Sequence, residues 1–240
     1  MLKPNLSHYL DAWLWRKSLS RLVAVAVSAT LLSSCGGGSD KGLLLVAPAA
    51  PAAFTLQLLH VADADVNDTT ALGSVAHMSG LVARFRADMP QTTLVVSSGD
   101  NYIPGPRFNA SGDASLAPLL GTPDVGRADI DFLNTIGVQA SALGNHELDL
   151  GPLQFNNIIS SEGTGTAVWP GARFPYLAYN VNFALESTVA ARVAPNGALA
   201  ATLANRVSGW ARVTYGAETI GIMGASSPAR SEERRVGKEC

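Results

Sequence analysis

The sequence predicts an α/β fold in which apolar strands alternate with helices and end in polar clusters. Three stretches support this prediction, and they are Phe54 to Val61, Thr92 to Ser98 and Val138 to Leu143. Each is an apolar run of strand length, as expected for a buried strand. Carboxylate or amide side chains follow each run within a few residues. Because an open α/β sheet binds ligands beyond the carboxyl ends of its strands, these clusters are the candidate functional site.

Composition sets the outer limits of the interpretation. The chain has 240 residues, 47% of them hydrophobic, which is enough for one domain with a real core. Its net charge of −2 gives no electrostatic basis for binding nucleic acid, so we expect no nucleic-acid partner. Two cysteines exclude a dense disulfide framework, and 23 glycines with 13 prolines fit a loop-rich α/β domain.

Residues 1–35 have the pattern of a lipoprotein-type signal peptide. A basic region is followed by an apolar run from Leu22 to Leu32, which is shorter than the ~20 residues of a membrane-spanning helix. The run leads to Cys35 in a sequence that resembles a bacterial lipobox, where the cysteine receives lipid. We therefore expect a lipid anchor at Cys35, which places the protein in the periplasm or at the cell surface. An ordinary signal peptide with an incidental cysteine is the alternative, and residues 36–53 are expected to form a linker.

Two carboxylates follow the first predicted strand. Asp63 and Asp65 are two residues apart, so both side chains point to the same side if the chain stays extended. A bound cation would relieve the repulsion between them. A loop of turn-forming aspartates is the alternative. His60 lies within the strand and is expected to be structural.

A helix is predicted from Gly73 to Met89, and Pro90 closes it. Its apolar stripe has spacings of three and four residues and consists of Val75, Met78, Leu81, Val82 and Phe85. His77 lies beside this stripe. We expect it to be a surface or packed residue and not a metal ligand.

The second predicted strand leads to Asp100, and a long loop from Asn101 to Thr122 follows. Its length suggests an active-site rim or a lid. Arg107 in this loop is a candidate contact for a substrate phosphate, because a guanidinium suits that geometry, and a solvated side chain is the alternative. A helix is expected from Pro123 to about Ile136, where Gly137 ends it.

The third predicted strand leads into the stretch from Gly144 to Asp149. This stretch contains an amide, an imidazole and two carboxylates within five residues, and Gly144 allows the chain to turn sharply. The elements expected downstream are a helix over 153–160, a loop over 163–171, and strands over 176–181, 207–215 and 218–223, the last two joined as a hairpin at Gly216-Ala217.

Three motifs in these stretches resemble the first three signature blocks of the calcineurin-like metallophosphoesterases. They are Asp63-Ala64-Asp65, Gly99-Asp100 and the stretch from Gly144 to Asp149. The third is similar to the G-N-H-E-F-D block of the bacterial 5′-nucleotidase branch of secreted phosphatases, with Leu148 in place of phenylalanine. The resemblance covers residues 54–229. It implies the two-sheet αββα sandwich of that family, incomplete at the C-terminus.

The resemblance also implies a cofactor of two divalent metal ions, which are Mn, Zn, Mg or Ca. The residues that match the ligand positions are Asp63, Asp65, Asp100, which would bridge the metals, and Asn145. Asp65 stands where the family has histidine. Either it is a ligand that favours Mn, Mg or Ca over Zn, or it is not a ligand.

His146 matches the catalytic histidine of the family. Asp149, three residues later, is expected to orient its imidazole, and Glu147 is expected to support the loop. The implied activity is hydrolysis of phosphate monoesters, with a small phosphorylated substrate such as a 5′-nucleotide, in nucleotide catabolism outside the cytoplasm. A cyclic-nucleotide phosphodiesterase, a general alkaline phosphatase and a degenerate lipid-anchored binding protein without activity are the alternatives. The sequence assigns no residue to substrate binding.

Residues 230–240 differ in character from the rest of the chain. Seven of these eleven residues are charged, against 15% of the whole chain. The string resembles a translated sequencing-adapter read-through, and a genuine charged tail is the alternative. The family's later blocks supply further histidine ligands, and His8, His60 and His77 match none of them. We therefore expect this fragment to be a poor catalyst.

Overall fold

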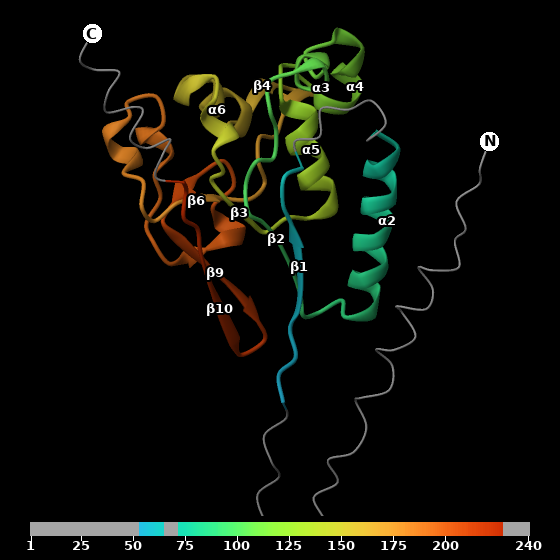
Figure 1. Cartoon of the computed structure of the whole chain (residues 1–240), viewed down its shortest axis with the longest axis vertical. Helices are drawn as coiled ribbons and strands as arrows, with labels where there is room; N and C mark the ends of the chain where they lie inside the picture. Colours follow the sequence, from blue (N-terminus) through green and yellow to red (C-terminus); the bar gives the residue numbers. More distant parts are fainter. Residues whose placement is uncertain (1–52, 65–71, 228–240) are drawn as a thin grey trace, which may run out of the picture. The chain divides into compact units, whose positions relative to one another are not determined.

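The computed structural model describes residues 53–64 and 72–227, and they form an α/β fold (Figure 1). A five-stranded sheet has the strand order β1-β2-β3-β6-β8, and a three-stranded sheet has the order β10-β9-β7. The predicted α/β class is therefore confirmed. The predictions for the signal peptide, Cys35, the linker, Asp65 and the charged tail lie outside the described residues.

All neighbouring strands of the five-stranded sheet are parallel. The strands are β1 (Gln57–Val61), β2 (Thr93–Ser97), β3 (Ala140–Ala142), β6 (Tyr176–Leu177) and β8 (Val207–Ser208). The three strands that carried the fold prediction are present, each shorter than predicted. The first was predicted to be buried, and this was wrong, because β1 is an edge strand on which Leu58 and His60 are exposed.

Three helices pack on one face of this sheet. They are α2 (Leu72–Asp88), α5 (Arg127–Ile136) and α6 (Gly151–Ile159), and α5 lies between the other two. Their apolar side chains, such as Val82, Leu133 and Phe155, share a core with Val95 and Tyr176 of the sheet.

The apolar stripe predicted for α2 is only partly buried. Val82 belongs to the core, whereas Leu81 and Phe85 are 57% and 41% exposed. The reason is the position of α2, which is the outer helix of its layer and packs mainly against α5 among the helices. His77 is exposed, so it is a surface residue, which is one of the two environments predicted for it.

The second sheet packs on the opposite face of the first. It contains β7 (Ala198–Leu199), β9 (Trp210–Tyr215) and β10 (Glu218–Met223). A second core joins Leu94 and Leu177 of the first sheet to Ala211 and Val213 of β9. The Tyr215 hydroxyl reaches across and donates to the Thr93 carbonyl oxygen at 2.9 Å. The described residues thus form three layers, one of helices and two of sheet.

The predicted hairpin of β9 and β10 is confirmed. The strand predicted over 207–215 is in fact two strands that lie in different sheets, since the chain leaves β8 at Gly209 and continues as β9. Trp210, Arg212 and Thr214 of β9 are exposed. Within the described residues no further layer covers this part of β9.

Two regions that were predicted to be loops contain regular structure. The segment 101–122 contains α3 (Pro106–Ala110), a 3-10 helix at Ala114–Leu116 and α4 (Ala117–Leu120). Pro106 and Pro118 stand at the starts of α3 and α4, where proline fits a helix, and not inside them. The segment 163–171 forms most of the hairpin of β4 (Glu162–Thr164) and β5 (Ala167–Trp169).

The helix predicted from Pro123 begins later, at Arg127, because Gly126 has a φ of 75° and cannot be helical. Gly137 ends it as predicted, with a φ of 74°. The remaining 3-10 helices are at His146–Leu148, Phe183–Leu185, Ala190–Arg192 and Ala200–Thr202. No helix in the described part of the chain has the length and apolar character needed to span a membrane.

Candidate active site

The polar clusters after β1, β2 and β3 lie at one edge of the sheet. Val61 pairs with Ser97 and Ser97 pairs with Ser141, so the ends of the three parallel strands are side by side. Asp63 and Asp100 follow the first two of these ends with φ angles of 50° and 52°. Such angles are uncommon for residues other than glycine and gather at functional sites. Asp63 is exposed and Asp100 is half-buried.

The loops after β2 and β3 meet at two glycines. A Cβ atom on Gly99 would lie 2.2 Å from the Gly144 nitrogen, and Gly99 also has a φ of 97°. A Cβ atom on Gly144 would lie 2.2 Å from both the nitrogen and Oδ1 of Asp100. Both positions therefore require glycine, since real Cβ atoms do not approach other atoms so closely.

Reciprocal hydrogen bonds join the same two loops. The His146 backbone N–H donates to Asp100 Oδ1 at 2.9 Å. In return, the backbone N–H groups of Asp100 and Asn101 donate to the two carboxylate oxygens of Glu147 at 3.0 and 2.9 Å. The Glu147 side chain therefore supports the loop, which is the role expected from the sequence. We call these two linked segments, residues 99–101 and 144–147, the interlocked loops.

Glu147 is buried, with 1% of its surface exposed. This burial raises the pKa of its carboxyl group to about 7, and the N–H groups of Asn101 and Asp100 oppose the rise because they favour the charged form. The carboxyl group is thus held away from water with both oxygens used, so it is a structural partner of the Asp100 backbone.

His146 and Asp149 are in contact within the single turn that follows β3. His146 Nδ1 lies 2.7 Å from Asp149 Oδ2. A carboxylate at this position holds the proton on Nδ1 and fixes the ring, which leaves Nε2 as the nitrogen for a ligand. Their spacing of three residues predicted this arrangement, because residues three apart in a helical turn share a face.

A buried network beneath the interlocked loops was not predicted. Asn101, which has no exposed surface, accepts a hydrogen bond from Ser97 Oγ at 2.6 Å. Its amide nitrogen donates to Ser141 Oγ at 2.9 Å and to the Tyr176 hydroxyl at 3.0 Å. The network thus joins β2, β3 and β6. Serines inside two otherwise apolar strands were the available sequence signal.

Arg107 has protein partners that were not predicted. Its Nη2 lies 2.6 Å from Oδ1 of Asp129, a buried residue of α5. Its Nη1 donates to the Ala64 carbonyl oxygen at 3.4 Å. Arg107 therefore links the chain next to Asp63 to a helix of the core. The solvated alternative is wrong, and a contact with a substrate phosphate stays a prediction.

The oxygen donors at this edge fit part of a metal site. Asp63, Asp100 and Asn145 offer carboxylate and amide oxygens, which hard divalent cations prefer. Within residues 53–64 and 72–227, no three His, Cys, Asp or Glu side chains gather closely enough to hold a metal ion. Asp63, Asp100 and Asn145 would therefore supply part of a coordination sphere of six or more oxygens, and water or other groups would supply the rest.

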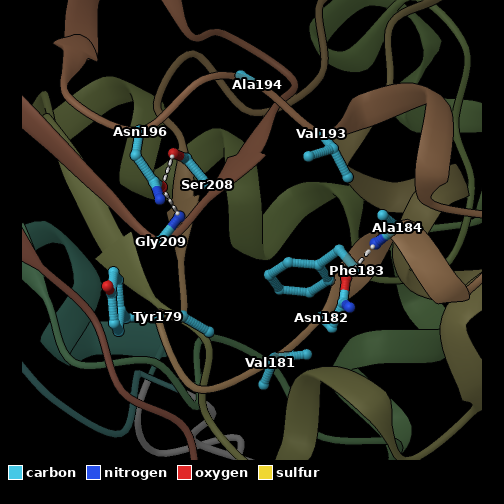
Figure 2. Close-up of a pocket in the computed structure, with 11 residues that line it drawn as sticks. Tyr179, Val181, Asn182, Phe183, Ala184, Val193, Ala194, Asn196, Ser208 and Gly209 are labelled. Atoms are coloured by element: carbon cyan, nitrogen blue, oxygen red, sulfur yellow. Dashed lines mark hydrogen bonds between the residues drawn. The ribbon is translucent and has the colours of Figure 1, made fainter.

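A pocket lies further along the same edge, beyond the ends of β6 and β8 (Figure 2). Its volume is about 170 Å³. Figure 2 shows Asn182 and Phe183 on one side and Asn196 with Ser208 on the other. Asn196 Oδ1 accepts hydrogen bonds from Ser208 Oγ and the Gly209 N–H. No charged side chain is among the described residues that line the pocket, so it offers apolar and neutral polar surface.

Comparisons with known proteins name similar chains. The 5′-nucleotidase of Bos taurus is 27% identical over 162 residues, which cover 68% of this chain and 22% of the bovine protein. The 5′-nucleotidase precursor of Thermus thermophilus is similar in structure, with a TM-score of 0.46, 24% identity, and coverage of 74% of this chain and 30% of that one. For the NAD nucleotidase of Haemophilus influenzae the TM-score is 0.42, the identity is 19%, and the coverage is 74% and 27%.

No family model matches the chain. The chain spans between about a fifth and a third of the length of these relatives. The bovine relative is named 5′-nucleotidase, the same name as the branch that the three sequence motifs resemble.

Proposed function

We propose that the protein hydrolyses phosphate monoesters, with 5′-nucleotides as the substrates, at the carboxyl edge of the five-stranded sheet. The observation that carries the proposal is the junction of Asp100 with the His146–Asp149 pair. One hydrogen bond links the Asp100 carboxylate to the His146 backbone, and another orients the His146 ring. An oxygen donor and an oriented imidazole are thus held in one rigid unit.

In this proposal Asp63, Asp65, Asp100 and Asn145 would hold two divalent metal ions, with Asp100 between them. When bound, such ions neutralise charge on the phosphoryl oxygens and lower the pKa of a coordinated water towards ~7. Carboxylate and amide oxygens are suited to Mg²⁺, Mn²⁺ or Ca²⁺. Glu147 and the two glycines keep Asp100 in place for this role.

His146 is the proposed catalytic residue. Asp149 accepts a hydrogen bond from Nδ1–H, which leaves Nε2 for the substrate. When protonated, Nε2 would donate its proton to the leaving oxygen. The uncharged pocket of Figure 2 suits the neutral part of such a substrate, because no charge lines it.

We also propose that the protein acts outside the cytoplasm, in the periplasm or at the cell surface, and is anchored through lipid on Cys35. The basic and apolar pattern before Cys35 supports this location. A Cys35→Ala variant should move from the membrane fraction to the soluble extracytoplasmic fraction.

A lipid-anchored binding protein without activity is the second candidate. It is favoured by the aspartate at position 65 and by the three oxygen donors that the described residues provide. This candidate predicts metal binding without turnover.

The test separates the two. The reading frame is first resequenced past codon 229, and the full-length product is assayed with AMP, p-nitrophenyl phosphate and bis(p-nitrophenyl) phosphate, with Mn²⁺ or with EDTA. We expect Mn²⁺-dependent release of phosphate from AMP, and a loss of about 10²–10⁴-fold in kcat for His146→Ala. His77→Ala is the matched control, because this exposed histidine of α2 should leave kcat unchanged.

Three results would overturn the proposal or part of it. Absence of metal-dependent hydrolysis would overturn the proposed activity and favour the second candidate, the lipid-anchored binding protein. Preference for the diester would indicate a phosphodiesterase, and equal rates on AMP and p-nitrophenyl phosphate would indicate a general phosphatase. A His146→Ala variant as active as His77→Ala would remove the assigned catalytic role.

A further inference from the structure

A second cavity lies at the other end of β3, with a volume of about 490 Å³. Gln139, which lines it, comes just before β3, whereas Asn145 comes after it. The two are six positions apart in the sequence, so up to about 20 Å of extended chain lies between the cavity and the candidate active site. Its volume falls within the range of small-molecule pockets, roughly 300–1,000 Å³.

The charge of this cavity is positive. Arg173 and Arg212 are the charged residues among those described as lining it, and no acidic residue lines it. Neither guanidinium makes a hydrogen bond or an ion pair with the described part of the chain, and both residues are exposed. Partial burial raises the pKa of the nearby Asp131 carboxyl group, and the positive charge of Arg173 opposes this rise without a direct ion pair.

A third arginine adds to this charge. Arg86 Nη2 donates to the carbonyl oxygens of Ile136 and Gly137 at 2.9 and 3.3 Å, at the carboxyl end of α5. Gly137 itself lines the cavity. The guanidinium of Arg86 is therefore fixed beside the cavity, where its charge favours an anion.

Neutral hydrogen-bond donors also line the cavity. Gln139 Oε1 accepts the Val95 N–H at 3.2 Å, which fixes the amide orientation, because only the oxygen can accept. The amide nitrogen of Gln139 then has two N–H groups that make no hydrogen bond to the described residues. Thr214, whose hydroxyl is also a donor, lines the cavity as well. The cavity thus presents several donors together with two unpaired positive charges.

We propose that this cavity binds an oxyanion, namely a phosphate group, at a site separate from the candidate active site. A guanidinium presents a planar fork of N–H donors that matches phosphate oxygens, and two guanidiniums that make no hydrogen bond or ion pair to the described residues suit a doubly charged oxyanion. The ligand is either free phosphate or the phosphate group of a small molecule. This site does not depend on the proposed hydrolytic function.

The test is calorimetric titration of the full chain with inorganic phosphate, at constant ionic strength and with EDTA present to keep metal ions from binding phosphate elsewhere. We expect saturable binding that is weakened at least tenfold in the Arg173→Gln/Arg212→Gln variant. The matched control is Arg84→Gln/Arg206→Gln, which removes two positive charges from other exposed positions. Thermal unfolding checks that both variants are folded, as expected for exposed side chains.

The alternatives give different results. Absence of phosphate binding, or equal weakening by the control variant, would overturn the site. Loss of binding in Asn145→Ala, with binding kept in Arg173→Gln/Arg212→Gln, would place the phosphate in the candidate active site instead. Acetate binding as tightly as phosphate would overturn the assignment to a dianion. A second titration with glycerol phosphate distinguishes the two possible ligands. Tighter binding of glycerol phosphate than of inorganic phosphate indicates that the ligand is a phosphorylated small molecule, and tighter binding of inorganic phosphate indicates free phosphate.

Discussion

At the scale of single residues, Glu147 has the most consequential position in the interlocked loops. Its two carboxylate oxygens accept the backbone N–H groups of Asp100 and Asn101. A third hydrogen bond runs from the Tyr102 hydroxyl to the Glu147 carbonyl oxygen at 3.0 Å. The side chain is buried, so water cannot replace these bonds when one is lost.

We predict that Glu147→Gln destabilises the protein by about 1–3 kcal/mol. An amide has one oxygen, so its nitrogen would face a backbone N–H and leave a buried donor without an acceptor. The free energy of unfolding from urea titration measures this effect. Glu218→Gln is the matched control, because Glu218 is exposed on β10 and its change should stay within roughly ±0.5 kcal/mol. Equal losses in the two variants would contradict the role assigned to Glu147.

Short-range contacts of the site could be predicted from sequence, and long-range contacts could not. The contact between His146 and Asp149 follows from a spacing of three residues in one turn. Asn101 instead meets Ser141 and Tyr176, which are 40 and 75 residues further along the chain. Such partners depend on strand order, which the periodicity of a single sequence does not contain. The ion pair of Arg107 with Asp129 was missed for the same reason.

At the scale of elements, the close approach of the turns after β2 and β3 depends on Gly99 and Gly144. The atoms of Asp100 occupy the space where a side chain on Gly144 would begin. The two turns therefore cannot approach in this way with any other residue at position 144.

We predict that Gly144→Ala costs about 1–3 kcal/mol of stability, because the new methyl group forces the two turns apart. It should also weaken Mn²⁺ binding, since Asp100 and Asn145 would move relative to each other. Thermal unfolding and Mn²⁺ titration measure the two effects.

Gly80→Ala provides the control of opposite sign. Gly80 lies inside α2 with no other atom within 4 Å of the added methyl group. Alanine should therefore stabilise the helix by about 0.5–1 kcal/mol. A Gly144→Ala variant that behaves like Gly80→Ala would show that the turns have room to adjust.

Helices and strands were predictable where one pattern governed them. The 17 residues of α2 and the hairpin of β9 and β10 have clear periodicity and turn residues, and both are present. The short helices α3 and α4 were missed because their prolines were taken as loop residues, although proline is favourable in a first helical turn. The division of 207–215 between two sheets was also missed, since only Gly209 separates the two strands.

At the scale of the whole molecule, the five-stranded sheet has a core on each face. The helices cover one face, and the three-stranded sheet covers the other through Leu94, Leu177 and Val213. The second core is the smaller one, and the hydrogen bond from Tyr215 to Thr93 reinforces it. The attachment of the second sheet therefore depends on few side chains.

We predict that Leu94→Ala lowers the free energy of unfolding by about 2–5 kcal/mol, because it leaves a cavity between the two sheets. Leu94 is 3% exposed in the structure. Urea titration measures the loss, and amide hydrogen exchange should show faster exchange in β9 than in β2.

Leu81→Ala makes the same chemical change at an exposed position of α2. Its effect should stay within roughly ±0.5 kcal/mol. Similar losses in the two variants would mean that the second core contributes little to stability.

The hydrogen bonds of Asn101 also have a consequence for biosynthesis. Its partner Tyr176 lies 75 residues later in the chain. At about 5–20 residues per second, a ribosome needs roughly 4–15 s to add those residues. During that interval the nascent chain contains Asp100 and Asn101 without the strand that completes their support. The candidate site therefore assembles late, and a chaperone that shields the first strands during synthesis should raise the yield of folded protein.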